Sequence, residues 1–89
     1  MTTDEQLIIR LCNQDRQSLE DIYNRYEKLL WNIASKTTTE PGICEQIITQ
    51  VFQELWNHPQ KFNNGRKLSS LLIECCKSHL SLFIMSKTS

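Results

Sequence analysis

One short segment, residues 58–67 (HPQKFNNGRK), carries side chains that could recognise a single nucleic-acid strand. Its cations could neutralise phosphates, its amides could hydrogen-bond to base edges, and the ring of Phe62 could stack on a base. The cations and amides are Lys61, Asn63, Asn64, Arg66 and Lys67. The alternative is a solvated loop with one buried Phe, and the composition of the loop alone favours this alternative.

The rest of the chain offers no catalytic constellation. It contains no Gly-rich loop for phosphates, no nucleophile motif and no HExxH sequence. His58 lies at the predicted end of one helix and His79 on the apolar face of another, so each is expected to be structural. The sequence therefore predicts a binding protein without enzymatic activity and without a cofactor.

The four cysteines do not form a zinc-finger pattern, because no CxxC pair is present. Cys12, Cys44 and Cys75 each fall on a predicted apolar face, and Cys76 follows directly. In a reducing compartment such residues pack as small hydrophobic side chains. Core packing is therefore expected, with a metal or redox role as the alternative.

Composition and charge indicate one soluble domain. The chain has 89 residues, 39% hydrophobic and 22% charged, with a net charge of zero. Nine of the ten acidic residues precede position 57, whereas the ten basic residues divide equally around it. This asymmetry fits a face at one end that binds nucleic acid or an acidic partner, or it arises by chance. No secretory signal and no uninterrupted apolar run of about 20 residues is present, so we expect a cytoplasmic protein with no membrane partner.

Hydrophobic periodicity predicts four helices, at residues 4–13, 16–35, 41–57 and 68–84. Asp15 is placed to cap the second helix, and Pro41 suits the first turn of the third. Only two Gly and two Pro occur, which favours long helices over a sheet with many turns. The prediction is an all-α, compact four-helix bundle that forms a single domain over residues 1–89.

The two C-terminal helices have distinct faces. The polar face of the third is mostly uncharged, whereas a purely solvated face usually carries more Lys and Glu, so a partner surface is compatible with it. This polar face comprises Glu45, Gln46, Thr49, Gln50, Gln53 and Asn57. The apolar face predicted for the fourth helix comprises Leu68, Leu71, Leu72, Cys75, His79, Leu82 and Phe83.

The order of these pieces resembles region 2, the N-terminal conserved domain, of bacterial sigma factors, most closely the extracytoplasmic-function group. Residues 4–30 are similar to the family's short helix, Asp-containing turn and helix with paired Tyr. The matching positions there are Asp15, Leu19, Glu20, Tyr23 and Tyr26. In the third helix Val51, Phe52, Leu55 and Trp56 match, and Phe62, Gly65, Leu68 and Leu72 follow in the family's order. The resemblance covers nearly the whole chain.

The resemblance implies a role in transcription initiation. In that family the polar face of the third helix grips the clamp coiled coil of the largest RNA polymerase subunit. The loop that follows, with the start of the fourth helix, captures the unstacked −10 promoter strand. By position, the implied polymerase-binding residues are Gln46, Thr49, Gln50 and Gln53. The implied DNA-binding residues are Lys61, Asn63, Asn64, Arg66, Lys67 and Lys77.

The chain also departs from the family pattern. Gln46, Thr49 and Gln50 replace the usual acid and Gln-Glu pair, which weakens charge complementarity to a basic clamp. In the fourth helix, Leu71 stands where the family usually has an aromatic residue, Ser78 where it has Asn, and Leu82 where it has Asp or Asn. Met85 and Ser86 stand where it usually has basic residues. No second, helix-turn-helix domain is recognised, so we expect a shortened or a divergent region-2 protein. The second hypothesis is a degenerate sigma-like module that binds polymerase, or an anti-sigma factor, without melting DNA.

Overall fold

The chain folds into four α-helices and one 3-10 turn. The structure is a computed structural model that describes the backbone of residues 3–88 and the side chains of residues 4–85. The elements are α1 (Thr3–Cys12), α2 (Arg16–Thr37), α3 (Pro41–Asn57), η1 (Pro59–Phe62) and α4 (Leu68–Thr88). Residues 3–88 contain no strand. The predicted all-α class with four helices is confirmed.

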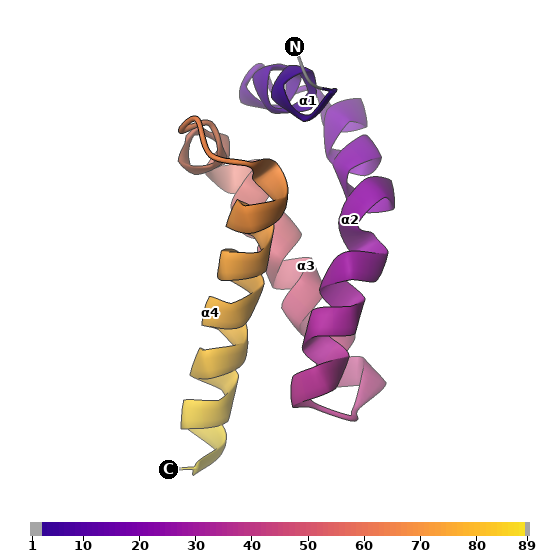
Figure 1. Cartoon of the computed structure of the whole chain (residues 1–89), viewed down its shortest axis with the longest axis vertical. Helices are drawn as coiled ribbons and strands as arrows, with labels where there is room; N and C mark the ends of the chain where they lie inside the picture. Colours follow the sequence, from indigo (N-terminus) through magenta and orange to yellow (C-terminus); the bar gives the residue numbers. More distant parts are fainter. Residues whose placement is uncertain (1–2, 89) are drawn as a thin grey trace.

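The three longer helices extend along the long axis of the molecule, and α1 lies across one end (Figure 1). At this end α1 contacts both the start of α2 and the η1 turn. Along the body, α2 packs against α3 and α4, and α3 packs against α4. The loop predicted to bind nucleic acid therefore lies next to the N-terminal helix.

The local signals at the helix ends work as their chemistry predicts. The side chain of Asp15 caps α2 by accepting a hydrogen bond from the backbone N–H of Gln17 at 3.1 Å. Pro41 opens α3, where its missing N–H costs nothing, and the helix ends at Asn57 as predicted. In contrast, α2 and α4 continue past their predicted ends, to Thr37 and Thr88.

The core consists of apolar side chains from all four helices and the η1 turn. Its fully buried centre includes Leu11, Ile22, Leu30, Leu55 and Leu72. The buried cysteines Cys44, Cys75 and Cys76 lie in the same cluster, and Cys12 packs against it. None of these four cysteines forms a disulfide. The expectation that the cysteines pack in the core is confirmed.

The buried face of α4 agrees with the predicted one at Leu68, Leu72 and Cys75 but differs from it at other positions. Leu82 was assigned to this face, yet it is 63% exposed. Cys76 and Leu80 are buried instead, at 0% and 4% exposure. The reason is that α4 is apolar over much of its circumference, so several helical faces fit the sequence, and only the packing against α2 and α3 selects one.

One segment of α4, Leu68–Met85, is long and apolar enough to cross a membrane by length and composition. A search for an uninterrupted apolar run misses it because Glu74 and Lys77 lie within it. A third of the segment (33%) is buried inside the molecule, and core helices of soluble proteins pass the same test.

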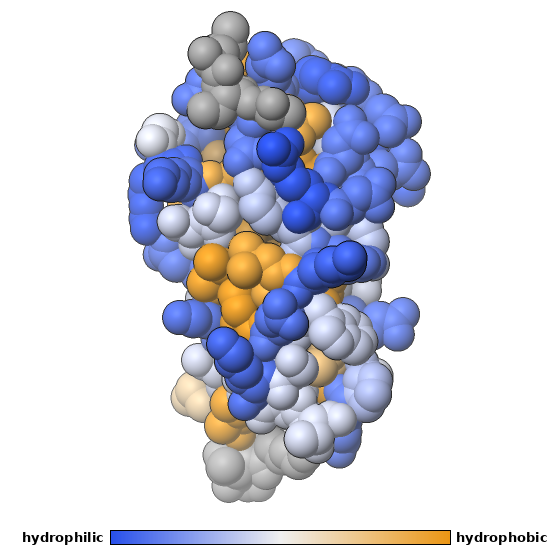
Figure 2. Space-filling model, turned by 45° about the vertical axis from the view of Figure 1, so that its right-hand side comes forward, coloured by the Kyte–Doolittle hydropathy of each residue, from blue (hydrophilic) through white to orange (hydrophobic). Residues whose placement is uncertain are grey.

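On the surface, Figure 2 shows a hydrophobic patch near the middle of a mostly hydrophilic face.

Candidate functional site

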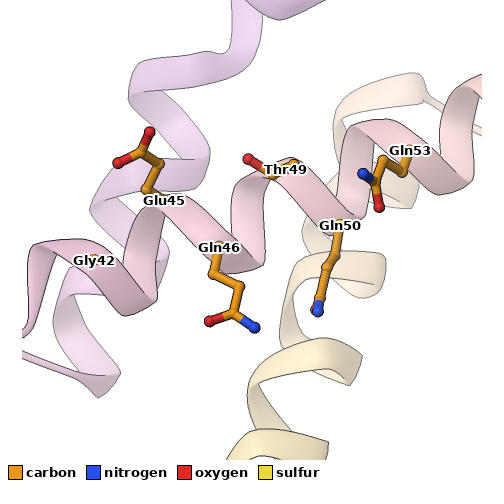
Figure 3. Close-up of a pocket in the computed structure, with 6 residues that line it drawn as sticks. All are labelled: Gly42, Glu45, Gln46, Thr49, Gln50 and Gln53. Atoms are coloured by element: carbon orange, nitrogen blue, oxygen red, sulfur yellow. The ribbon is translucent and has the colours of Figure 1, made fainter.

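The polar face of α3 forms a shallow groove of about 450 Å³. Its lining residues are Gly42, Glu45, Gln46, Thr49, Gln50 and Gln53, which are the six labelled residues in Figure 3. All four residues predicted to bind polymerase are thus brought together on one surface. In Figure 3, Gln46 and Gln50 project to one side of the helix and Glu45 and Thr49 to the other.

The groove is polar because α3 divides its side chains sharply between two faces. The opposite face buries Ile47, Ile48, Val51 and Leu55, which anchors the helix and fixes its rotation. The amides on the groove side can each donate and accept hydrogen bonds. Only Glu45 among the six lining residues is charged. The arrangement can therefore hydrogen-bond to a polar partner with little dependence on charge.

The loop after α3 is less free than its composition suggests. Phe62 is only 5% exposed and packs into the core, so it is not available to stack on a base. The prediction that Phe62 is buried is therefore confirmed. The side-chain amide of Asn64 already makes two hydrogen bonds within the loop. Its Oδ1 accepts one from the backbone N–H of Arg66 at 3.1 Å, and its Nδ2 donates one to the carbonyl of Lys61. Asn63 remains exposed.

Two of the predicted DNA-binding cations already have carboxylate partners. Lys61 Nζ lies 3.4 Å from Glu54 Oε1, and the guanidinium of Arg66 hydrogen-bonds to both carboxylate oxygens of Glu74. Lys67 and Lys77 are exposed. At about 1.5 Å per residue, Lys77 lies about 14 Å along α4 from its first residue, Leu68. The predicted DNA-binding cations are therefore distributed over the loop and α4 and do not form a single cluster.

A second groove, of about 570 Å³, was not predicted from the sequence. It lies between α1 and the loop, where Asp4, Glu5, Ile8 and Ile9 face residues of the loop and the start of α4. The residues on that side are Phe62, Asn63, Gly65, Arg66, Lys67, Leu68 and Ser69. The lining of this groove thus combines acidic, basic and apolar residues. Only the tertiary packing of α1 on η1 creates this groove, so no local sequence signal could reveal it.

A third feature combines residues of different helices. Glu54 on α3 meets Cys75 and His79 on α4, and one ligand atom from each lies within 4.8 Å of the other two. Cys75 and His79 are four residues apart, which places both on one helical face. That spacing was the available sequence signal, but Glu54 could be added only from the packing of α3 on α4.

The local electrostatics of this cluster depend on burial and hydrogen bonding. Burial raises the pKa of the Cys75 thiol to about 12, with the hydrogen bond to Glu54 acting in the same direction. The same hydrogen bond from Cys75 lowers the pKa of Glu54, against the effect of its partial burial. The proton of the pair is therefore on the sulfur of Cys75, and the ionised carboxylate of Glu54 accepts the hydrogen bond.

The chain was compared with family models, with curated proteins and with solved structures. None of the three comparisons found a match. A function is therefore inferred from the two grooves, the loop and the resemblance in the order of the sequence motifs.

Proposed function

We propose that this chain is a sigma region-2-like domain that binds RNA polymerase core through α3 and engages the −10 promoter strand through the loop and α4. The observation that carries the proposal is the groove on α3. The four residues that the resemblance assigns to polymerase, Gln46, Thr49, Gln50 and Gln53, all line it. The loop assigned to DNA follows directly at the end of the same helix.

Binding to polymerase would use hydrogen bonds more than charge. Three Gln amides and the Thr49 hydroxyl offer donors and acceptors along successive turns of α3. Such a row suits a partner helix that lies along the groove and presents polar side chains. The packed apolar face of α3 fixes its backbone and the side of the helix from which these groups project, which reduces the backbone entropy lost on binding.

Engagement of a DNA strand would begin at the exposed residues. Lys67 and Lys77 can contact phosphates, and the exposed amide of Asn63 can reach a base edge. Lys61 and Arg66 can join only when phosphate replaces Glu54 and Glu74 as their partners. The domain acts in this proposal by binding alone, without a chemical step of its own.

A second candidate function has its own supporting observation. The carboxylates of Glu54 and Glu74 neutralise two of the loop cations, and Asp4 and Glu5 line the groove beside the loop. These acidic groups disfavour a nucleic-acid strand. The second candidate is therefore a sigma-like interaction module that binds polymerase or an anti-sigma factor without opening DNA.

One pair of binding measurements separates the two candidates. The purified protein is titrated with RNA polymerase core and, separately, with a single-stranded oligonucleotide carrying a −10 element. The variant Lys61→Ala/Arg66→Ala/Lys67→Ala serves as the comparison. The first candidate predicts binding to both, with oligonucleotide binding lost in the triple variant and core binding kept.

Other outcomes are equally informative. Binding to core without binding to the oligonucleotide contradicts the DNA role and supports the second candidate. Absence of binding to core contradicts a polymerase role for this chain in both candidates.

A further inference from the structure

The side chains of Glu54, Cys75 and His79 converge where the C-terminal half of α3 packs against the middle of α4. One ligand atom from each lies within 4.8 Å of the other two. The closest pair is Cys75 Sγ and Glu54 Oε2, at 2.8 Å, in a hydrogen bond from thiol to carboxylate. Three different metal-ligating groups from two packed helices therefore face one point.

The donor set has the chemistry of a zinc site. Zinc is held in proteins by thiolate sulfur, imidazole nitrogen and carboxylate oxygen, at about 2.0–2.3 Å. Ligands at those distances around a tetrahedral ion are about 3.5 Å apart, from the same bond lengths. The three donors would therefore need shifts on the order of 1 Å. Glu54 and His79 are only half-buried, so both side chains have room to make them.

We propose that Glu54, Cys75 and His79 bind a divalent transition-metal ion of the Zn²⁺ class, with water as the fourth ligand. This site is separate from the α3 groove and does not depend on the function proposed for it. Three protein ligands and one open position distinguish it from a closed, four-ligand structural site.

The charge and proton balance of binding is simple. The metal-free site holds one proton on the sulfur of Cys75, shared with the ionised carboxylate of Glu54. The metal ion takes the place of this proton and forms one bond each to the Cys75 sulfur, a Glu54 oxygen, a ring nitrogen of neutral His79 and a water, while the proton leaves to solvent. No electron is transferred.

Lys61 is the charged neighbour of this site. Its Nζ lies 3.4 Å from Glu54 Oε1, the carboxylate oxygen that does not contact Cys75. The Lys61 side chain is 60% exposed, so it can move into solvent when a cation approaches. The metal therefore competes with a weak surface ion pair, which opposes binding only slightly.

The test uses Co²⁺ as a spectroscopic probe, added to the reduced full chain, followed by displacement with Zn²⁺. The unaltered protein should bind one equivalent of Co²⁺, with a thiolate-to-cobalt charge-transfer band and the visible bands of four-coordinate cobalt. Zn²⁺ should remove both. Cys75→Ser should abolish the charge-transfer band, while its hydroxyl can still donate to Glu54 and preserve the packing.

The other two ligands are tested by affinity. His79→Ala and Glu54→Gln should each weaken Co²⁺ binding about tenfold or more, because loss of even an outer-shell partner costs about 10-fold to 100-fold. The matched controls are Cys76→Ser, next in sequence, and His58→Ala, the other histidine; both should bind as the unaltered chain does. Circular dichroism of each variant verifies that its helices are intact.

Two results would overturn the proposal. One is the absence of a charge-transfer band in the unaltered protein, which leaves the three residues as a hydrogen-bonded packing contact. The other is a band that survives Cys75→Ser, or that Cys76→Ser removes equally, since the ion would then be bound by other cysteines.

Discussion

The guanidinium of Arg66 donates hydrogen bonds to both carboxylate oxygens of Glu74, which links the loop after η1 to the second turn of α4. Both side chains are more than half exposed, at 56% and 55%. Exposed ion pairs contribute little to stability, so this pair is easily exchanged for another partner. A phosphate is such a partner, since Arg binds phosphate and carboxylate with the same forked geometry. In the proposed DNA role, exchange of this pair would therefore release the Arg66 charge to a nucleic acid.

Removal of the Glu74 charge should strengthen binding to a single strand. Glu74→Gln frees the Arg66 guanidinium for one additional phosphate contact. The plot of log affinity against log salt concentration should then become steeper by about 0.7, the value for one more contact on a single strand. The measurement is an oligonucleotide titration at several salt concentrations.

The control for this change is Glu20→Gln, which removes the same charge from an exposed position on α2. If the two variants bind alike, the effect comes from net charge and not from Arg66. An unchanged salt slope in Glu74→Gln would contradict a role for Arg66 in phosphate binding.

The rotation of α4 gives a second prediction with a matched pair on one helix. Leu80 is 4% exposed and Leu82 is 63% exposed. Leu80→Ala should lower the free energy of unfolding by about 2–5 kcal/mol, because it removes buried methyl groups and leaves a cavity. Leu82→Ala should change it by about 0.5 kcal/mol or less, as surface substitutions do. Urea unfolding measures both, and equal losses would contradict the observed rotation.

The contrast between α3 and α4 explains how far the sequence can predict this fold. In α3 the apolar and polar residues occupy opposite sides, so its rotation and five of the six groove residues follow from periodicity, and its first residue follows from Pro41. In α4 apolar residues such as Leu71, Ile73 and Leu82 surround the helix, and none of them is fully buried. Its rotation is set by the neighbouring helices, which the sequence of α4 alone does not contain.

The candidate sites divide in the same way. The polar face that forms the α3 groove could be predicted because one helix supplies all its residues. The groove beside Phe62 needs α1 against the loop, and the cluster around Cys75 needs α3 against α4. The ion pair between Arg66 and Glu74 likewise joins residues eight positions apart. It depends on the shape of the turn at Gly65, whose φ is +84°, so it could not be predicted from the sequence pattern.

The Tyr26 hydroxyl gives a prediction about alkaline pH. It donates a hydrogen bond to Asp4, and burial, followed by this bond, raises the pKa of Tyr26 from 10.0 to about 12. Between about pH 10 and pH 12 the unfolded tyrosine loses its proton while the folded one keeps it. This contribution to stability is therefore complete below pH 10 and is lost as the pH rises towards 12.

Tyr26→Phe tests this relationship. The variant should lose about 0.5–1.5 kcal/mol at neutral pH with the hydrogen bond, and its stability should fall less steeply above pH 10. An absorbance titration of tyrosinate should show that the later of the two tyrosine ionisations has disappeared, leaving that of Tyr23. Loss of the earlier ionisation instead would contradict the assignment.

The central claim, that the α3 groove binds the polymerase clamp, is tested most directly by opposite charges at Gln46. This side chain is exposed and lines the groove, at a position that the proposed function assigns to polymerase binding. Against a basic clamp, Gln46→Glu should tighten binding to RNA polymerase core and Gln46→Lys should weaken it. Each change should be about twofold to fivefold, the value of one exposed charge pair.

Asn24 supplies the control, because it is exposed on α2 and does not line the groove. Asn24→Glu and Asn24→Lys should leave the affinity for polymerase core unchanged. If the α3 groove binds the clamp, the affinity shifts in opposite directions at Gln46 and does not shift at Asn24. Equal affinities of the two Gln46 variants, or shifts of the same size at Asn24, would contradict it.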